Sequence, residues 1–304
     1  MGYTAFGNGS EQIIFFAVGH GANGKSSFLD ALRHALGRYA ATTEVRTFAI
    51  RGNDVVRNDL ARLAGVHMVT ASEPHHRMTI DESLVKQMTG GSPITARFLY
   101  GEYFEFLPRF VAWIDTNHKP TIRGTDHGIW RRIVLIPFDQ TIVDDERDTE
   151  LSAKLRSERC GILAWLVKGA AAWYQKGLDV PESVRAATAA YRRDEDQVGQ
   201  FLKQCCELNG AASCPFGELY ERYKWWVETQ GFGQMSARTF SDKLRERGFE
   251  SEERGKSHTT MVLGVQLASR ANQSKAESSA SIASYLSAKS SEVGLADLAR
   301  NAAA

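Results

Sequence analysis

The sequence predicts an α/β protein with a parallel-type sheet, followed by a mainly helical region and a disordered tail. Through the first half, short apolar runs alternate with amphipathic stretches, which is the pattern of strands and helices in a parallel sheet. Beyond Asp145 the apolar residues recur at helical spacing. From Ser269 to Ala304, Ser and Ala dominate and large apolar residues are few. Burial of so little apolar surface cannot offset the entropy lost on ordering, so this segment is expected to be disordered.

Four strands and three helices are expected in the first part. Each strand is a short apolar run, at residues 13–18, 66–71, 110–116 and 132–137. Amphipathic spacing places helices between them, at residues 25–36, 59–63 and 81–88, the last capped by Thr79 or Asp81. Residues 93–108, rich in Tyr and Phe with several charges, predict a hairpin or an extended excursion.

The predicted domain boundary lies near Asp179 to Pro181. Gly177 is a typical helix stop and Pro181 a typical helix start, so we place a linker between them. The expected divisions are a core at residues 1–145, a helical connector at 146–180, a helical and winged-helix domain at 181–268, and the tail at 269–304.

Helices followed by a hairpin predict the winged helix. The helices are expected at residues 182–208, 216–230 and 237–247, and the strands at 250–253 and 260–267. Arg238, Lys243 and Arg245 would then lie on a helix that enters a DNA groove. Because basic and acidic residues nearly cancel across this region, a protein-contact or purely structural module is the alternative.

Composition excludes several classes of protein. The chain has 37 Lys and Arg residues and 36 Asp and Glu residues, a net charge of +1. The net charge therefore gives no indication of a nucleic-acid or membrane partner. The longest apolar run, residues 13–18, is far shorter than the roughly 20 residues of a membrane span. The four cysteines lack the paired spacing of a zinc site and are too few for a disulfide framework. With no signal-peptide pattern at the N-terminus, we expect an intracellular protein with no membrane partner.

The most specific motif is Gly-His-Gly-Ala-Asn-Gly-Lys-Ser at residues 19–26, which satisfies GxxxxGK[ST] between an expected strand and an expected helix. Its glycines let backbone N–H groups surround a phosphate chain at a helix N-terminus. ATP and Mg²⁺ are therefore the expected cofactors, with Lys25 on the β and γ phosphates and Ser26 on the metal. The expected nucleotide-binding residues are Gly19, Gly21, Ala22, Asn23, Gly24, Lys25, Ser26 and Ser27.

Polar residues that follow neighbouring strands are candidates for the chemistry of hydrolysis. The second strand runs into Glu73, which we interpret as the acid on the Mg²⁺ side, and the third ends at Asn117, whose amide would orient water. Arg131 and Arg132 lie at the start of the fourth strand and suit a developing phosphoryl charge. Each residue has a structural alternative. Glu73 would be a surface glutamate, Asn117 would form a turn, and the two arginines would form surface salt bridges.

In combination these residues resemble the superfamily 3 helicase domain of phage and plasmid primase-helicase proteins, a branch of the AAA+ ATPases. The resemblance covers residues 2–138. Beyond the glycine-rich loop and Glu73, it rests on four further segments: Lys-Gln-Met-Thr-Gly-Gly at 86–91, Ile-Thr-Ala-Arg at 94–97 with Tyr100, Thr-Asn-His-Lys-Pro at 116–120, and Asp-His-Gly-Ile-Trp-Arg-Arg at 126–132. It implies a P-loop NTPase core of AAA+ type.

By that resemblance Lys25 and Ser26 carry the Walker A functions, Glu73 is the Walker B acid and Asn117 is the sensor. Arg131 or Arg132 would be the finger that reaches a neighbouring subunit's ATP, which requires a homo-oligomer, typically a hexameric ring. The segment between Glu73 and Asn117 would carry a DNA-facing hairpin, and its candidate contacts are Lys86, Arg97 and Tyr100.

Two departures from the family pattern stand out. Ser72 precedes Glu73 where some relatives carry a second acid, so Mg²⁺ would be held mainly by Ser26 and waters. The glycine-rich loop also begins at residue 19, whereas such proteins usually carry a helical segment ahead of it. We therefore expect an N-terminally shortened member of the family or the product of a split gene.

The expected function is an ATP-dependent DNA helicase of superfamily 3 type, acting in phage, plasmid or prophage replication in the cytoplasm of a bacterial host cell. Its expected partners are single-stranded and forked DNA, further copies of itself and a primase. One rival is an ATP-binding initiator or DNA-binding fragment that does not unwind DNA. A second rival is an AAA+ protein remodeller.

Overall fold

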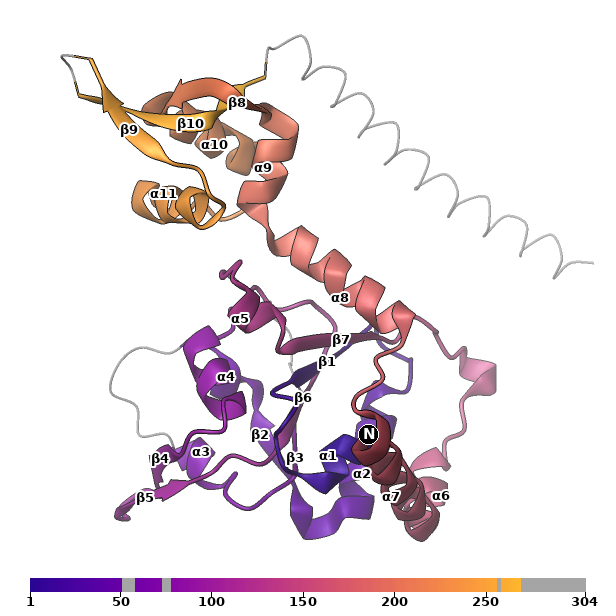
Figure 1. Cartoon of the computed structure of the whole chain (residues 1–304). Helices are drawn as coiled ribbons and strands as arrows, with labels where there is room; N and C mark the ends of the chain where they lie inside the picture. The colour runs from indigo at the N-terminus through magenta and orange to yellow at the C-terminus, as the bar shows by residue number, and fades with distance from the viewer. Residues whose placement is uncertain (51–57, 73–77, 256–257, 269–304) are drawn as a thin grey trace, which may run out of the picture. The chain divides into compact units, whose positions relative to one another are not determined.

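The computed structural model describes residues 1–50, 58–72, 78–255 and 258–268, and its chain divides into two compact units, residues 1–195 and residues 196 onward (Figure 1). The boundary lies after helix α8 (Glu182–Glu195), not near residue 180 as the sequence indicated. Tyr191 of α8 is fully buried beside Phe16 and Trp130, and the Leu135 N–H donates to the Thr188 hydroxyl at 3.0 Å. These contacts make α8 part of the first unit.

A five-stranded parallel sheet forms the centre of the first unit, with strand order β2-β3-β6-β1-β7. Its strands are β1 (Ile14–Val18), β2 (Ala40–Glu44), β3 (Met68–Ser72), β6 (Val111–Thr116) and β7 (Ile133–Pro137). The α/β class and the four expected strands are confirmed. Strand β2 was not expected, because it reads Ala-Ala-Thr-Thr-Glu and lies at the sheet edge with no fully buried residue.

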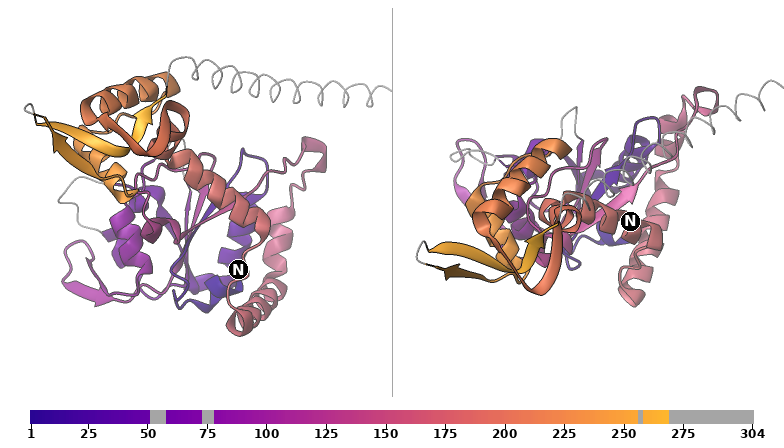
Figure 2. Two further views of the ribbon diagram at one scale, coloured as in Figure 1. Left: turned by 45° about the horizontal axis from the view of Figure 1, so that its top comes forward. Right: turned by 90° about the horizontal axis from the view of Figure 1, so that it is seen from above.

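Helices cover both faces of this sheet, as Figures 1 and 2 show. Successive residues of a strand point to opposite faces. Accordingly Ile14 and Phe16 pack with the helices α3 (Asn58–Ala61), α4 (Glu82–Thr89) and α5 (His127–Trp130). Phe15 belongs to the other core cluster, with α1 (Gly2–Phe6), α2 (Lys25–Leu36) and α7 (Arg159–Lys176). Burial on both faces explains why the central strands are continuously apolar.

The remaining elements of the first unit are short. The expected hairpin within residues 93–108 is confirmed as an antiparallel pair, β4 (Ile94–Arg97) and β5 (Tyr103–Phe106), which stands away from the main sheet in Figure 1. Helix α6 (Leu151–Ser157) precedes α7, and single 3₁₀ turns lie at η1 (Gly37–Tyr39), η2 (Val45–Phe48) and η3 (Asp144–Glu146). Among the described helices, none is long and apolar enough to cross a membrane.

The second unit combines three helices with a three-stranded antiparallel sheet of order β8-β10-β9. Its elements are α9 (Gln197–Cys205), β8 (Cys206–Pro215), α10 (Phe216–Gln230), α11 (Ala237–Glu246), β9 (Ser251–Arg254) and β10 (Thr259–Leu267). The single helix expected at residues 182–208 is wrong. Asp196 interrupts it by accepting a hydrogen bond from the Gly199 N–H at 2.9 Å, which starts α9 as a separate helix. The tail expected at 269–304 lies outside the described residues.

Aromatic packing holds the second unit together, and Phe240 lies at its centre. This ring is fully buried and stacks on Tyr223 with centroids 4.5 Å apart, while Phe201 contacts it edge-on at 5.9 Å. Replacing a buried Phe by Ala costs about 3–5 kcal/mol. We therefore expect Phe240→Ala to remove hydrogen-exchange protection from α9, α10 and α11 while β1 and β6 keep theirs. Trp225→Ala, at a partly exposed ring, is the control that should leave all of them protected. Unchanged protection in Phe240→Ala would contradict this account of the core.

Candidate functional site

The glycine-rich loop lies between the end of β1 and the first residue of α2. Gly21 has φ 66° and Gly24, the N-cap of α2, has φ 79°, conformations that L-residues seldom adopt. A Cβ atom on Gly19 would collide with the Phe138 carbonyl oxygen. The Asn23 amide donates to that same oxygen at 3.1 Å and so ties the loop to the chain after β7. Glycine is therefore required at these three positions, either by the backbone conformation or by the close approach of another segment.

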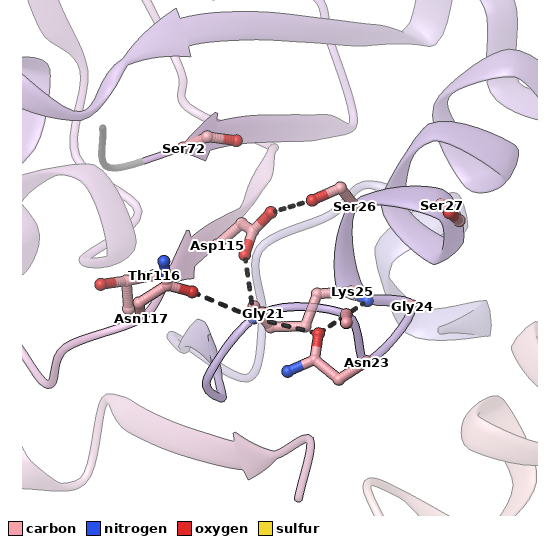
Figure 3. Close-up of a pocket in the computed structure, with 11 residues that line it drawn as sticks. Gly21, Asn23, Gly24, Lys25, Ser26, Ser27, Ser72, Asp115, Thr116 and Asn117 are labelled. Carbon is pink, nitrogen blue, oxygen red and sulfur yellow. Dashed lines mark hydrogen bonds and ion pairs between the residues drawn. The ribbon is translucent and has the colours of Figure 1, made fainter. Parts of the chain in front are cut away.

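Lys25 is buried at the base of the loop, with 3% of its surface exposed. Its ammonium donates to the Gly19 carbonyl at 2.6 Å and to the side-chain oxygen of Asn23 at 3.1 Å (Figure 3). A longer contact of 3.4 Å reaches the side-chain oxygen of Asn117 at the end of β6. The predicted sensor asparagine and the predicted phosphate-binding lysine are therefore brought together.

Ser26 contacts a carboxylate that the sequence reasoning did not select. The Ser26 hydroxyl donates to Oδ2 of Asp115 at 2.7 Å, and the Lys25 ammonium lies 3.9 Å from Oδ1 (Figure 3). Asp115 is only 8% exposed. It lies opposite Ala17 in the parallel register of β1 and β6, which places it beside the loop that follows β1. The sequence does carry a signal for Asp115, because this residue lies with Asn117 at the polar end of the third expected strand.

These side chains line one pocket of about 410 Å³. Its walls are the residues 21–27 of the loop and of the first turn of α2, together with Ser72, Asp115, Thr116 and Asn117. Backbone N–H groups at a helix N-terminus and a buried ammonium suit a phosphate chain. A hydroxyl and a carboxylate side by side are oxygen ligands of the kind that Mg²⁺ takes, directly or through water. Glu73, the predicted acid, lies outside the described residues.

The two candidate finger arginines have different surroundings. Arg132 is 8% exposed, and its guanidinium donates to the Thr89 hydroxyl at 2.9 Å and to the Gly128 carbonyl. Burial and the adjacent charge of Arg131 lower the pKa of the Arg132 guanidinium. Arg131 is exposed, with a hydrogen bond of 2.5 Å to the Gln12 side chain. Arg132 thus holds α4, α5 and β7 together, whereas Arg131 faces outward.

Neither arginine reaches the pocket of its own chain. Ile133 pairs with Ile14 at one end of the parallel β1–β7 ladder, and Pro137 pairs with Val18 at the other. The glycine-rich loop follows Val18, whereas Arg131 precedes Ile133. Four residue steps of about 3.3 Å separate the two ends, so roughly 13 Å of strand lies between Arg131 and the loop.

The three predicted DNA contacts of the first unit lie on two elements. Tyr100, at the turn of the β4–β5 hairpin, is 100% exposed, and the Arg97 guanidinium lies 4.8 Å from the ring centroid of the exposed Tyr103. Lys86 lies on α4 instead, and its ammonium contacts the Asp126 carboxylate at 3.1 Å. Partial burial raises the pKa of Asp126. The hydrogen bond and charge of Lys86, together with the backbone N–H groups of Ile129 and Gly128, outweigh that effect, so the pKa lies below its ordinary value. The positive charge of Lys86 is therefore already paired.

The predicted DNA contacts on α11 also differ from one another. Arg238 and Arg245 are exposed, and Arg245 forms a surface pair with Asp242 at 3.3 Å. Lys243 departs from the prediction because it is buried, at 9% exposure, on the side of α11 that carries Phe240 and Leu244 into the core. A basic residue at that helical position cannot present its charge to DNA as freely as its neighbours do.

Comparisons with known proteins point to viral helicases. The profile of a family described as poxvirus D5 protein-like matches residues 193–262, almost wholly within the second unit. The chain is 28% identical over 251 residues to "Putative helicase L207/L206" of Acanthamoeba polyphaga mimivirus, covering 75% of this chain and 26% of that protein. It is 26% identical over 245 residues to "Putative helicase 022R" of Frog virus 3, covering 74% and 25%. The chain thus spans about a quarter of the length of these relatives.

Solved structures share the fold. A structure of the C-terminal region of NrS-1 superposes with a TM-score of 0.51 at 13% identity, covering 87% of this chain and 70% of that one. A second structure of that region gives 0.52 at 12% identity. The similarity in sequence supports a helicase-like role in a viral setting. The relatives come from viruses named for amoeba and frog hosts, so they lend no support to the expected phage, plasmid or bacterial setting.

Proposed function

We propose that this chain is the ATP-hydrolysing part of a viral DNA helicase of superfamily 3 type. The observation that carries the proposal is the single pocket in which Lys25, Ser26, Asp115 and Asn117 meet at a glycine-rich helix N-terminus. The similarity to viral proteins named as helicases supports the same activity over three quarters of the chain. Unwinding, DNA binding and assembly are likewise proposals, because the chain spans only about a quarter of the length of these relatives.

The pocket fits MgATP by its donors and acceptors. The loop N–H groups and Lys25 would bind the β and γ phosphates, displacing Lys25 from its contacts with Gly19 and Asn23. Ser26 would hold Mg²⁺ together with Glu73 and water, and the bound ion supplies charge neutralisation at the phosphates. The Asn117 amide, next to Lys25, would orient the attacking water. Catalysis would then consist of positioning and charge stabilisation.

The placement of Arg131 supports a finger that acts in trans. It is exposed and separated from the pocket of its own chain by the length of β7, so a γ phosphate within its reach would have to belong to a neighbouring copy. An arginine supplied in this way requires an oligomer, and a closed hexameric ring is the form we propose. Arg132 is the weaker candidate, because its guanidinium is engaged inside its own unit.

The exposed hairpin β4–β5 is the proposed contact with single-stranded DNA. An aromatic ring with a free face stacks on any base, and alanine replacement of such a ring costs about 1–3 kcal/mol per base. We expect the double variant Arg97→Ala, Tyr100→Ala to weaken binding of a fluorescent oligothymidylate about tenfold or more, as measured by anisotropy. Lys86→Ala is the matched control and should change affinity less, because Asp126 already neutralises that charge. Equal losses in the two variants would contradict the assignment of the hairpin.

The second unit has the element order of a winged helix. Helix α9, strand β8, helices α10 and α11, and the β9–β10 hairpin follow one another, with β8 pairing with β10. In such a module α11 would enter a DNA groove, and Arg238 and Arg245 are its exposed basic residues. A protein contact, for instance with a primase, is the alternative, because acidic side chains pair with several basic ones here, as Glu252 does with Arg254.

Strand displacement on forked DNA tests the proposed function. We expect the chain, assembled in the presence of Mg²⁺ and ATP, to release the labelled strand of a fork, and to fail with a non-hydrolysable ATP analogue. Nucleotide binding without DNA-stimulated turnover would favour the initiator or DNA-binding fragment instead. Turnover stimulated by an unfolded protein and not by DNA would favour a protein remodeller.

A further inference from the structure

Among the described residues, the carboxylate that bonds to the Ser26 hydroxyl comes from β6, a strand that the sequence did not indicate as the source of an acid. In nucleotide-binding loops of this kind, the loop Ser or Thr and an acid at the end of a neighbouring strand hold Mg²⁺ together. Here Ser72, the last residue of β3, has no charge and stands where a second acid would precede Glu73, and the Ser26 hydroxyl bonds to Asp115 of β6. Figure 3 shows the Asp115 side chain directed from β6 toward Ser26.

The sheet register explains how β6 can supply this group. Ser72 and Asp115 are direct partners in the parallel pairing of β3 with β6, so they lie at the same level at the carboxyl edge of the sheet. Asp115 is also the partner of Ala17 on β1, one residue before that strand ends. Because β6 lies between β3 and β1, its side chain is one strand closer to the loop than any side chain of β3.

The environment of Asp115 keeps its carboxylate engaged with the loop. A buried carboxylate is costly unless charges or hydrogen bonds compensate it. One oxygen accepts from Ser26 at 2.7 Å, and the other faces the Lys25 ammonium at 3.9 Å. Because the Ser26 hydroxyl donates its hydrogen bond to Asp115, the lone pairs of Ser26 Oγ stay available to a cation.

We propose that Asp115 is the positioning acid of the Mg²⁺ site, acting through Ser26 and filling from β6 the place that Ser72 leaves without charge on β3. This inference rests on the proposed function, because it concerns MgATP in the same pocket. Asp115 orients the Ser26 hydroxyl toward the ion, and its negative charge strengthens the hydrogen bond that holds this orientation. Loss of a group in this second layer around a metal typically costs 10–100-fold in metal affinity.

The test compares binding of a fluorescent ATP analogue in Mg²⁺ and in EDTA, without any turnover measurement. In the unmodified chain Mg²⁺ should tighten binding. Asp115→Asn keeps the shape and a hydrogen-bond acceptor for Ser26 but removes the charge, so we expect the Mg²⁺-dependent gain to fall about 10- to 100-fold. Affinity in EDTA should stay the same or rise. Asp30→Asn, an equal loss of charge on the exposed side of α2, should leave both affinities unchanged.

A double-variant cycle shows whether the effect of Asp115 on Mg²⁺-dependent binding passes through Ser26. If Asp115 acts through Ser26, the variant carrying Ser26→Ala and Asp115→Asn should lose no more of the Mg²⁺ effect than Ser26→Ala alone. Fully additive losses, or an unchanged Mg²⁺ effect in Asp115→Asn, would overturn the inference. An unmodified chain that fails to bind the analogue in either buffer would instead overturn the proposed function.

Discussion

Replacing Lys25 by alanine is expected to lower the rate of ATP hydrolysis by about 10²–10³-fold, the usual cost of losing one preorganised group that stabilises transition-state charge. The Lys25 ammonium is buried at the base of the loop, within hydrogen-bond distance of three side-chain or backbone oxygens. No other cationic side chain lines the described pocket, so nothing there can take its place. Steady-state phosphate release at saturating ATP measures the effect.

The matched control for Lys25 is Lys176→Ala. Lys176 is an exposed residue at the last position of α7, and its removal changes the net charge equally without touching the pocket. Hydrolysis by this control should equal that of the unmodified chain. If Lys25→Ala kept a rate within threefold of the control while remaining folded, the pocket would not be the site of hydrolysis.

Arg131→Ala is expected to give the largest loss of turnover, about 10³-fold or more, because an arginine finger typically contributes 10³–10⁵ to the hydrolysis rate. The affinity for nucleotide should hardly change, since Arg131 lies far from the pocket of its own chain. Arg132→Ala should instead lower stability, because it leaves the Thr89 hydroxyl and the Gly128 carbonyl without their buried donor. Turnover and thermal unfolding measured on both variants separate the two functions.

Mixing two inactive variants tests whether Arg131 acts between copies. A Lys25→Ala chain keeps its finger, and an Arg131→Ala chain keeps its pocket, so a mixed assembly contains interfaces at which both are intact. We expect mixing to restore part of the hydrolysis that each variant lacks alone. No recovery in assemblies shown by mass measurement to be mixed would contradict a finger in trans.

The central strands and the glycine-rich loop could be predicted because their signals are local. Buried parallel strands are continuously apolar, as in Ile14–Val18, and the loop needs glycine at positions where φ is positive. The edge strand Ala40–Glu44 has neither signal, because one of its edges lacks a neighbouring strand and its side chains are partly exposed. Its pairing with β3 depends on the tertiary structure.

Features of the site that depend on contacts between distant segments were missed. Asp115 lies 89 positions after Ser26, and only the pairing of β6 with β1 brings the two side chains together. The pairing of Lys86 with Asp126 across 40 positions is equally invisible to local patterns, and so is the burial of Lys243. Residue type predicted which side chains could do chemistry, whereas the fold decided which of them face the pocket.

The most direct test of the account is ATP hydrolysis by this chain with and without single-stranded DNA, with the mass of the assembly measured in the same buffer. A motor that couples the pocket to DNA should hydrolyse ATP several-fold faster when an oligonucleotide is present, as a multimer, and Lys25→Ala should abolish that stimulation. A folded multimer that binds ATP and DNA yet hydrolyses at the same rate with and without DNA would contradict the proposed coupling.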